Sequence, residues 1–449
     1  MPPTTDNANE PNRLPGGAAG AIIGWLPASS GSQRRYTLNP IEHIMETNLL
    51  IFNCGSSSLS YKVYRLAAQG QPEEIATGKA YHVGTKSQEE SYLQYKAGGH
   101  SEKEVQPLPN HREAARAILQ YLQHIDLPVQ VIGHRFVHGG TQFAESAWIT
   151  PESLPRLEQC SPLAPIHNPN SLSVIHLCQE MLPQALQFAA FDTAFHAGLP
   201  EKAYRYALPT ALADQFGFRK YGFHGLSYQY VSLQASRFLQ APLENLKIVA
   251  CHLGTGGSSV AAIQGGRSLD TSMGYSPLPG LVMSTRCGDL DPAVVLELIG
   301  ERGYSVEAVN RLLNKDSGLV GVSGYSSDLF ELIQRMEEPG GEKARLAVEM
   351  YVHRLKSYIG AYLAILGGAD ALVFTDDIGV RAWQVRARAC ARMEWCGIRL
   401  DEDANRRAPA NQITLVSQAD SPVKVLSIPT DEEAVIALDG ARLLQQQTH

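Results

Sequence analysis

The sequence predicts an α/β protein with mixed sheets that is built from two related halves. Segments with strand and helix patterns alternate along the chain, and one device occurs twice: an apolar strand, a tight Gly/Ser loop and a second strand. The first copy spans residues 48–64, and the second spans residues 247–263. A chain of 449 residues is also long for one hydrophobic core. We therefore expect two domains that are versions of one fold.

The remaining elements follow from the hydrophobic pattern, taken in chain order. Residues 68–110 are polar and predict exposed strands and turns, and strands alternate with helices again between residues 222 and 302. Buried strands are expected at residues 128–134, 186–192 and 371–375. Helices are expected at residues 111–124, 170–187, 343–366 and 380–397. Residues 1–47 are rich in Pro, Gly, Ala and Ser, and we expect a disordered or non-native N-terminal extension there.

The composition is that of an ordinary globular protein, with 44% hydrophobic and 18% charged residues. A formal net charge of −7 argues against a nucleic-acid-binding protein. No apolar run reaches the length of about 18 residues that a membrane span needs. The seven cysteines are scattered and form no C-x-x-C pair, which disfavours both a disulfide framework and a zinc site. We therefore expect a cytoplasmic protein without a membrane partner.

Both Gly/Ser loops place several small residues in succession, so that backbone N–H groups can converge on an anion while hydroxyl groups add donors. The candidate phosphate-binding residues are Ser56, Ser58 and Ser60 in the first copy and Gly254, Thr255 and Gly256 in the second. A plain hairpin turn is the alternative for either loop taken alone. Two loops in the same frame instead predict a cleft that binds a phosphate chain from both sides.

Five further residues have side chains suited to anion or metal chemistry. Arg135 ends a strand beside paired glycines, which suits bidentate binding of a carboxylate or phosphate but also an ordinary surface ion pair. Asp192 ends a buried strand, where ligand-binding residues often lie, or else caps the next helix. His224 has glycines on both sides in the sequence, which favours a functional role, although a structural histidine is the alternative. Arg286 is expected on a loop. Glu432 opens the final helix, where a carboxylate also favours the helix dipole.

Together these features predict phosphoryl transfer. That chemistry needs positive charge and positioning around the transferred group, and an oxygen ligand for Mg²⁺. The chain contains neither a Walker A sequence nor the protein-kinase motifs, so we expect a different kinase architecture.

Eight short stretches occur in the order of a known family. They are Asn53-Cys-Gly-Ser-Ser-Ser-Leu, Gly133-His-Arg-Phe-Val-His-Gly-Gly140, Ala164-Pro-Ile-His-Asn-Pro169, Phe191-Asp-Thr-Ala-Phe-His196, Tyr221-Gly-Phe-His-Gly225, Asp270-Thr-Ser-Met-Gly, Thr285-Arg-Cys-Gly-Asp289 and Pro429-Thr-Asp-Glu-Glu433. With them, residues 48–437 resemble the acetate kinase family, of the sugar kinase/actin/heat-shock chaperone superfamily.

The resemblance implies two actin-like (ribonuclease H-like) domains with mixed sheets that flank an active-site cleft. It implies an N-terminal lobe at residues 48–193, joined by the C-terminal helix at about residues 431–449, and a C-terminal lobe at residues 194–430. It also implies a homodimer.

The activity that the resemblance implies is a reversible, Mg²⁺-dependent, direct in-line phosphoryl transfer between ATP and acetate, which gives acetyl phosphate and ADP. Asn53 and Glu432 match the positions that hold Mg²⁺. Residues matching the catalytic positions are Arg135, His167, Asp192, His224 and Arg286, of which Arg135 also contacts acetate. Residues matching the apolar pocket for the acetate methyl group are Val137, Ile166, Phe223 and Pro277. Residues on the phosphate and nucleotide side are His252, Asp328, Phe330, Asp377 and Gly379, together with the two loops.

Departures from the family pattern fall on the nucleotide side. Ser60 stands where the family has a lysine, although Lys62 lies on the same strand, and Thr255 replaces an asparagine. Phe330 replaces an arginine that is associated with the adenosine. Phe374-Thr-Asp-Asp-Ile-Gly-Val-Arg381 replaces Phe-Thr-(Gly/Ala)-Gly-Ile-Gly-Glu-Asn, so that Asp377 places a charge where the nucleotide meets a glycine.

The acetate side, in contrast, looks intact, with Ile166 in place of the usual leucine as a volume-conserving change that should still favour acids of two or three carbons. Because ATP is the frequent donor in this family, we expect ATP as the phosphoryl donor. Pyrophosphate is the alternative, because some family members use it with a blocked adenosine pocket. A preference for propionate or butyrate and a non-catalytic ligand-binding homologue are the other interpretations that stay open.

Overall fold

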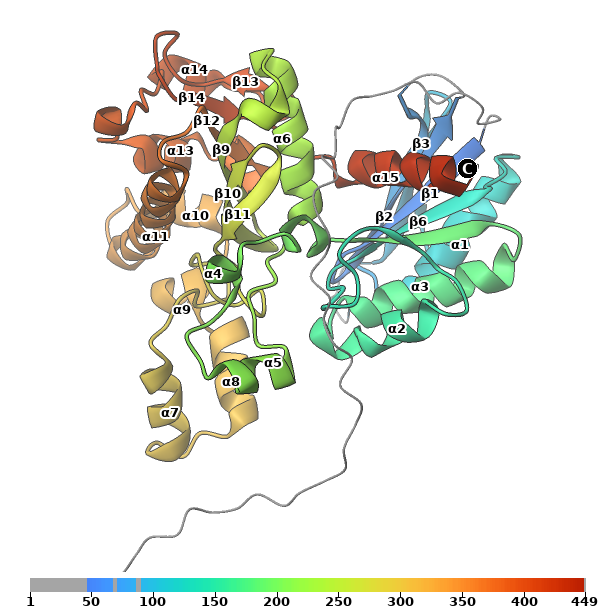
Figure 1. The fold of residues 1–449 in the computed structure, drawn as a ribbon, viewed down its shortest axis with the longest axis horizontal. Helices are drawn as coiled ribbons and strands as arrows, with labels where there is room; N and C mark the ends of the chain where they lie inside the picture. The colour runs from blue at the N-terminus through green and yellow to red at the C-terminus, as the bar shows by residue number, and fades with distance from the viewer. Residues whose placement is uncertain (1–46, 68–70, 86–89, 448–449) are drawn as a thin grey trace, which may run out of the picture. The chain divides into compact units, whose positions relative to one another are not determined.

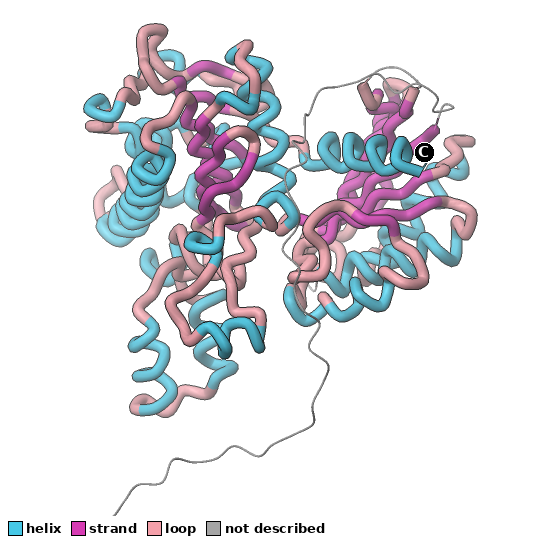
Figure 2. The backbone as a smooth tube through the Cα atoms, viewed as in Figure 1, coloured by secondary structure: helices cyan, strands magenta, loops and turns pink. Residues whose placement is uncertain are grey.

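The computed structural model describes residues 47–67, 71–85 and 90–447. The expected extension at residues 1–47 lies outside these ranges except for Thr47. Strands gather in two separate sheets with helices packed around each, as Figures 1 and 2 show. The predicted α/β class with mixed sheets is thereby confirmed.

The first sheet is built from the first half of the chain. Its strands are β1 (Thr47–Cys54), β2 (Ser58–Leu66), β3 (Glu73–Tyr81), β4 (Tyr92–Ala97), β5 (His100–Val105), β6 (Val131–Phe136), β7 (Ala147–Trp148) and β8 (Leu186–Phe191). In the described ranges their order is β5-β4-β3-β2-β1-β6-β8-β7. Strands β1 to β5 pair antiparallel in sequence order, whereas β6 runs parallel to β1 and β8 parallel to β6. The edge strand β7 is antiparallel to β8.

The second sheet repeats this topology. Its strands are β9 (Lys247–Gly254), β10 (Gly257–Gln264), β11 (Arg267–Thr271), β12 (Ala371–Thr375), β13 (Thr414–Leu415) and β14 (Lys424–Ser427). The order β11-β10-β9-β12-β14-β13 corresponds, strand by strand and direction by direction, to β3-β2-β1-β6-β8-β7. The two halves are therefore versions of one fold, and the two Gly/Ser loops occupy equivalent positions.

Helices cover both faces of the first sheet because successive strand residues point to opposite faces. These helices are α1 (His111–His124), α2 (Leu154–Gln159), α3 (Asn168–Met181) and α15 (Glu432–Gln447). On β1, Leu50 and Phe52 pack with α1 and α3, whereas Leu49 and Ile51 pack against Ile436 of α15. Figure 1 shows α15 and the α1/α3 pair on opposite sides of these strands. The last helix of the chain thus completes the core of the first half.

The second sheet also has helices on both faces. The helices of this half of the chain, not all of which lie on the sheet, are α4 (Glu201–Tyr204), α5 (Thr210–Phe216), α6 (Gly225–Leu239), α7 (Pro292–Gly300), α8 (Val306–Lys315), α9 (Gly318–Ser323), α10 (Leu329–Arg335), α11 (Glu342–Leu366), α12 (Asp376–Arg381), α13 (Trp383–Cys390) and α14 (Glu402–Arg407). Short 3₁₀ turns span Ser161–Leu163, Ala194–His196, Leu243–Asn245 and Glu394–Cys396.

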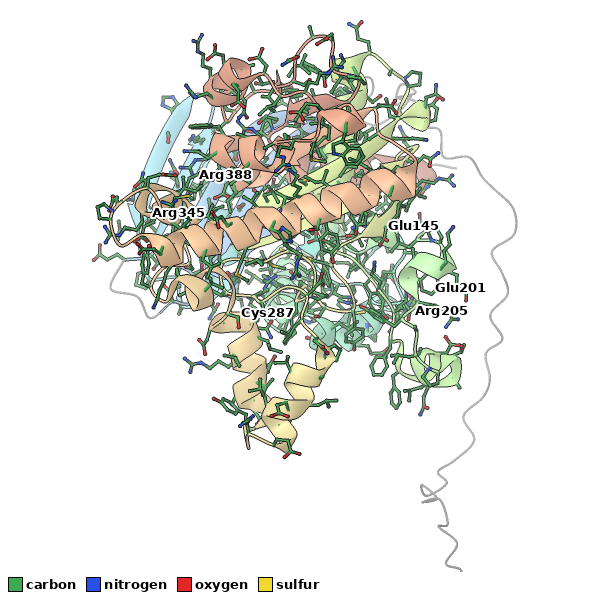
Figure 3. All side chains as sticks on the ribbon, turned by 90° about the vertical axis from the view of Figure 1, so that its left-hand side faces the viewer. Glu145, Glu201, Arg205, Cys287, Arg345 and Arg388 are labelled. Atoms are coloured by element: carbon green, nitrogen blue, oxygen red, sulfur yellow. The ribbon has the colours of Figure 1, made fainter. Side chains whose placement is uncertain are left out.

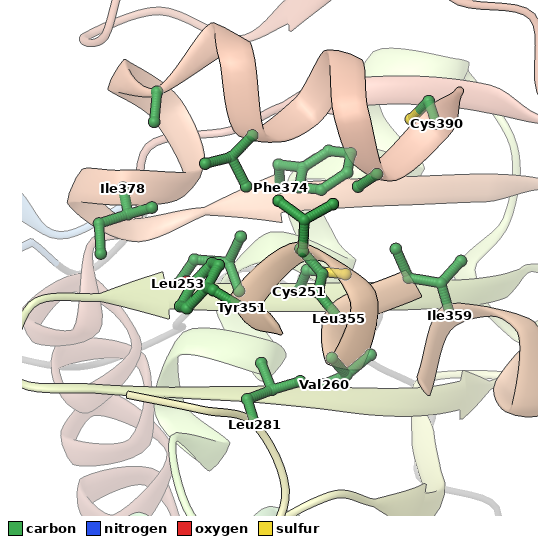
Figure 4. Packing of buried hydrophobic residues seen from close by; sticks show 14 of the residues in the cluster. Cys251, Leu253, Val260, Leu281, Tyr351, Leu355, Ile359, Phe374, Ile378 and Cys390 are labelled. Atoms are coloured by element: carbon green, nitrogen blue, oxygen red, sulfur yellow. The ribbon is translucent and has the colours of Figure 1, made fainter. Parts of the chain in front are cut away.

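On one face of this sheet, Cys251 packs with Tyr351 and Leu355 of α11, a cluster that Figure 4 shows from close by. On the other face, Ile248 packs with Val231 of α6. The long helix α11 crosses in front of the sheet in Figure 3. Both halves thus have a sheet between two layers of helices.

Most local predictions are confirmed. The helix predicted at residues 111–124 and the strand at 371–375 have the predicted bounds, and the long helix at 343–366 begins one residue earlier. The helix predicted at residues 380–397 is wrong, because α12 ends at Arg381 and α13 starts a new helix at Trp383. The buried Arg386 guanidinium takes the last carbonyl groups of α12, Gly379 O at 2.7 Å and Val380 O at 2.8 Å, and so ends that helix.

All seven cysteines are free, as expected from their scatter. Among the helices of the described ranges, none combines the length and apolar character that a bilayer crossing requires. The lobe boundary expected at residues 193–194 falls after β8 and stays a prediction.

Candidate active site

The first Gly/Ser loop joins β1 to β2 and is held from behind. Gly55 N donates to Ser58 O at 2.9 Å, which closes the turn and leaves Ser56 exposed. A ring nitrogen of His111, Nε2, lies 2.8 Å from Gly55 O. His111 is the first residue of α1 and only 4% exposed. Because the two groups of a trans peptide point in opposite directions, binding Gly55 O on one side directs the next N–H to the other.

Arg135, on β6, lies at the centre of a buried charge cluster. Its Nε and one terminal nitrogen donate to the two carboxylate oxygens of Asp192, at 2.9 and 2.7 Å. Its other terminal nitrogen donates to Asn53 Oδ1 at 2.9 Å and lies 3.1 Å from Glu432 Oε2. Asp192 is 1% exposed, and both its oxygens are taken by the guanidinium, so its side chain is an ion-pair partner and no helix cap.

Glu432 brings the C-terminal helix into the same cluster. Asn53 Nδ2 donates to Glu433 Oε1 at 2.9 Å and lies 3.4 Å from Glu432 Oε2. Burial raises the pKa of the Glu432 carboxyl above its ordinary value, and Arg135 offsets this only in part.

The neighbouring Asp431 caps α15 by accepting from Ala434 N at 3.0 Å, and it also accepts from Lys62 Nζ at 2.7 Å. Lys62 is thus engaged at the start of α15. It does not take the place of the lysine that the family pattern has at position 60. In this chain that position is Ser60, which lies opposite Asn53 on the paired strand.

Asn53 and Glu432 offer an amide oxygen and a carboxylate oxygen side by side, which is the donor chemistry that Mg²⁺ prefers. A buried carboxylate with a raised pKa is also one that a nearby cation stabilises. In the ranges that the structure describes, no group of three or more His, Cys, Asp or Glu side chains could hold a metal. The residues present fit an ion that takes one or two protein ligands and fills its remaining positions with water and substrate oxygen.

The second Gly/Ser loop joins β9 to β10, and two catalytic candidates lie against it. A Cβ atom on Gly257 would lie 3.3 Å from a terminal nitrogen of Arg286 and 3.5 Å from His224 Nε2. Arg286 donates to Gly256 O at 3.3 Å and to Pro277 O at 3.1 Å. The segment at residues 272–291 that carries Arg286 is therefore tied directly to the loop.

His224 precedes α6 in a left-handed conformation, with φ of +59°. The next residue, Gly225, donates its N–H to Asp192 O at 3.0 Å, and a Cβ there would lie 2.1 Å from that oxygen. This close approach explains the glycine. His224 Nδ1 lies 2.8 Å from Ser259 Oγ, and its ring stacks on His252 with centroids 4.0 Å apart. Burial, with the nearby His252, holds the pKa of His224 well below its ordinary value, so the imidazole is neutral.

His167 precedes α3 beside this cluster. Its Nδ1 is buried and has no hydrogen-bond partner in the described ranges. Burial and the Arg135 charge lower the pKa of His167 to about 4. A neutral imidazole with one buried, unpartnered nitrogen is suited to a hydrogen bond with a ligand.

The predicted methyl pocket is partly assembled. Val137 packs against a buried cluster of Phe223, Met273 and Met283. The two methionines were not predicted as pocket residues, although Met273 belongs to the Asp270-Thr-Ser-Met-Gly motif. Ile166 is 50% exposed and lies outside this cluster. Pro277 contacts the site through its carbonyl group, which accepts from Arg286.

Two of the nucleotide-side candidates also make contacts within the fold. Asp328 is the N-cap of α10, since its carboxylate accepts from Phe330 N at 2.8 Å. The Phe330 ring lies under the guanidinium of Arg381, 4.7 Å from the ring centroid. Asp377 is half-buried, and burial together with Asp376 raises its pKa. The sequence did not predict the contact of His111 with Gly55 or that of Phe330 with Arg381. The residues of these contacts are 56 and 51 positions apart, and no local motif marks them.

Comparisons with known proteins place the whole sequence and the fold beside one family. The sequence model of the Acetokinase family matches residues 48–438. The acetate kinase of Clostridium novyi (strain NT) is 42% identical over 405 residues, which cover 89% of this chain and 98% of that protein. The acetate kinase of Clostridioides difficile (strain 630) is 41% identical over 406 residues, or 88% of this chain and 100% of the relative.

Two crystal structures are also similar. That of acetate kinase from Entamoeba histolytica has a TM-score of 0.80 at 41% identity and covers 89% of this chain and 100% of its own. That of Porphyromonas gingivalis acetate kinase has a TM-score of 0.79 at 38% identity with the same coverage.

Replacing Glu432 by Gln tests its buried charge. Because the pKa is raised on folding, the folded state binds a proton that the unfolded state releases. The contribution of Glu432 to stability is therefore present below about pH 4.5 and is lost as the pH rises through the raised value. In chelator and at pH 8, we expect Glu432→Gln to raise the free energy of unfolding by about 1–2 kcal/mol, measured by urea denaturation.

At pH 4.5 the advantage of the Glu432→Gln variant should disappear. The control is Glu349→Gln, which changes an exposed carboxylate on α11. A Glu432→Gln variant that is less stable than wild type at pH 8 would contradict a raised pKa.

Proposed function

This chain belongs to the acetokinase family, and from that premise we propose that it is an acetate kinase that uses ATP. In this reaction a carboxylate oxygen of acetate attacks the γ-phosphorus of ATP. The bond from that phosphorus to the bridging oxygen breaks, and ADP leaves with the electron pair. The observation that carries the proposal is the convergence of Arg135, Asp192, His224 and Arg286 beside two equivalent Gly/Ser loops.

Phosphoryl transfer depends mainly on positioning and on positive charge around the transferred group. Arg135 and Arg286 supply that charge from the first and second halves of the chain. Asp192 orients Arg135, since both of its oxygens bind the guanidinium. His224 is neutral and its Nε2 lies beside Gly257, so it is suited to donate a hydrogen bond to a phosphoryl oxygen. The arrangement supports direct transfer without a covalent enzyme intermediate.

Asn53 and Glu432 are the residues that we expect to hold Mg²⁺. When bound, the ion neutralises charge on the donor phosphates. Arg135 contacts both residues, so the same guanidinium that binds substrate also orients the metal ligands.

We propose that Val137, Ile166, Phe223 and Pro277 surround the methyl group of acetate. The packing of Val137 on Phe223 and two methionines supports a small apolar pocket on this side. His167, with its unpartnered Nδ1, is suited to hydrogen-bond the substrate from the adjacent helix. A pocket of this kind favours carboxylic acids of two or three carbons.

Pyrophosphate is the second candidate donor, and a specific contact favours it. Phe330 and Arg381 both depart from the family pattern, and they stack on each other, which fills space on the predicted adenosine side. Asp377 adds a half-buried carboxylate there. A donor without a nucleoside does not need this space.

We further propose a cytoplasmic homodimer. The seven unpaired cysteines suit a reducing compartment. Helix α7 supports self-association because, apart from its contact with α8, it exposes apolar side chains, with Leu296 71% and Val294 43% exposed. In both views of the ribbon, α7 and α8 project away from the second sheet (Figures 1 and 3).

Removing Arg286 or Asp192 tests the catalytic assignment. We expect Arg286→Ala and Asp192→Ala each to lower kcat/KM by about 10²–10³-fold, because Arg286 supplies positive charge to the transferred group and Asp192 orients the Arg135 guanidinium that supplies it too. Activity is measured by trapping acetyl phosphate as the hydroxamate. Arg311→Ala, which removes a 76% exposed arginine side chain, is the control and should stay within twofold of wild type. Losses of only a few-fold in both variants would overturn these roles.

Parallel assays with ATP and with pyrophosphate identify the donor. If ATP is the donor, acetyl phosphate should form at least tenfold faster with ATP than with pyrophosphate at equal concentrations. The reverse ratio would establish the second candidate and reject the first. Hydroxamate from neither donor, with folded protein, would reject both kinase functions and favour a ligand-binding protein.

Introducing a charge on α7 tests the homodimer. We expect the wild-type protein to elute at twice the mass of one 48.9 kDa chain in light-scattering chromatography, and Leu296→Glu to elute as a monomer. Leu346→Glu, at a 51% exposed position on α11, is the matched control and should leave the mass unchanged. A monomeric wild type would reject the proposal.

A further inference from the structure

The residue that begins α12, Asp376, has an unusual backbone. Its φ is +62°, in the left-handed region that costs an ordinary residue about 1–2 kcal/mol. Aspartate and asparagine tolerate this conformation better than most residues, and strained backbone is common at functional sites. The left-handed turn comes directly after β12, at the edge of the sheet where the second Gly/Ser loop begins.

The Asp376 carboxylate is paired with a histidine of that loop strand. Its Oδ2 lies 3.1 Å from His252 Nε2. The other ring nitrogen of His252 lies 2.9 Å from Ser227 Oγ, which is in turn 3.0 Å from Thr430 Oγ1. Burial alone lowers the pKa of His252, but Asp376 more than offsets this and raises it, while His252 holds the pKa of Asp376 below its ordinary value. Each partner therefore favours the charged form of the other.

The same carboxylate also lies directly against the loop. A Cβ atom on Gly254 would be 2.0 Å from Asp376 Oδ2, so any larger residue there would displace the carboxylate. Its side chain is 33% exposed, which leaves one side of the carboxylate open. An anion bound by this loop needs the same backbone and the same imidazole.

The position of Asp376 is fixed by the rest of α12. Arg386, 1% exposed, donates to Gly379 O and Val380 O at the far end of that helix. It also donates to the side-chain and main-chain oxygens of Asn405, at 2.7 and 2.8 Å. Because the helix is anchored there, its first residue does not move freely away from Gly254.

We infer that the Asp376 carboxylate occupies the anion-binding position of the second Gly/Ser loop, where a donor phosphate must displace it from Gly254 and His252. This inference rests on the proposed function only in taking that loop as a donor site. Asp376 is then a determinant of donor affinity, and Asp377, one residue on, is not.

The test is calorimetric binding of inorganic pyrophosphate and of ADP to the full chain. Asp376→Asn keeps the shape and tolerates the left-handed backbone while removing the charge. We expect it to bind at least one of the two probes about tenfold more tightly than wild type, since charge-assisted bonds are the strong ones in such competition. Asp376→Gly should do the same without backbone strain.

Two controls separate this effect from a general change of charge. Asp403→Asn removes an exposed carboxylate of the same half, and its affinities should stay within twofold of wild type. The pKa of His252, followed by NMR of its ring protons, should fall in Asp376→Asn. Unchanged affinities for both probes in Asp376→Asn and Asp376→Gly would overturn the inference. A full effect from Asp377→Asn would overturn it as well.

The binding experiment does not depend on catalysis. The kinase function and the inference about Asp376 can therefore be rejected independently of each other. Tighter binding by Asp376→Asn without acetyl phosphate from either donor would reject the kinase function and keep the inference. Acetyl phosphate formation with unchanged affinities in the Asp376 variants would keep the function and reject the inference.

Discussion

The site depends on one guanidinium. Arg135 joins the end of β6 to Asp192 after β8, to Asn53 at the end of β1 and to Glu432 at the start of α15. Three parallel strands and a helix from the far end of the sequence therefore share one buried charge. Removing the guanidinium would leave the Asp192 and Glu432 carboxylates buried without a compensating positive charge, which costs several kcal/mol. The cluster thus constrains the fold and presents the metal ligands and the substrate-binding charge in a single arrangement.

The topological repeat sets two equivalent loops in place, but different contacts support them. His111 binds the first loop from behind through Gly55 O, leaving its front open. The second loop has Arg286 and His224 beside Gly257 and a carboxylate against Gly254. Duplication explains why both loops exist and why both begin at the end of a central strand. The side chains around them explain why the two loops are not interchangeable.

Local pattern was enough to predict much of this arrangement. The helix at residues 111–124 and the strand at 371–375 follow from periodicity, and the site candidates on strand ends meet because parallel strands end at one edge of a sheet. Contacts between distant segments could not be predicted in the same way. Nothing near His111 points to Gly55, and only the folded chain brings Arg381 over Phe330. The sequence pattern also pointed to Asp377. In the structure it is Asp376, with its left-handed backbone, whose carboxylate lies against the second loop.

The stacking of His224 on His252 affects which of the two rings binds a proton. With ring centroids 4.0 Å apart and both rings buried, His224 and His252 do not readily carry a charge together, so one bound proton is directed to His252 by Asp376. An incoming phosphate that replaces the carboxylate also brings negative charge to His252, so it takes over the role of Asp376 in favouring the protonated ring. With an uncharged residue in place of Asp376, that role would fall to the donor alone. Asp376 thus favours protonation of His252 ahead of the ligand, and the neighbouring His252 helps to hold the pKa of His224 low.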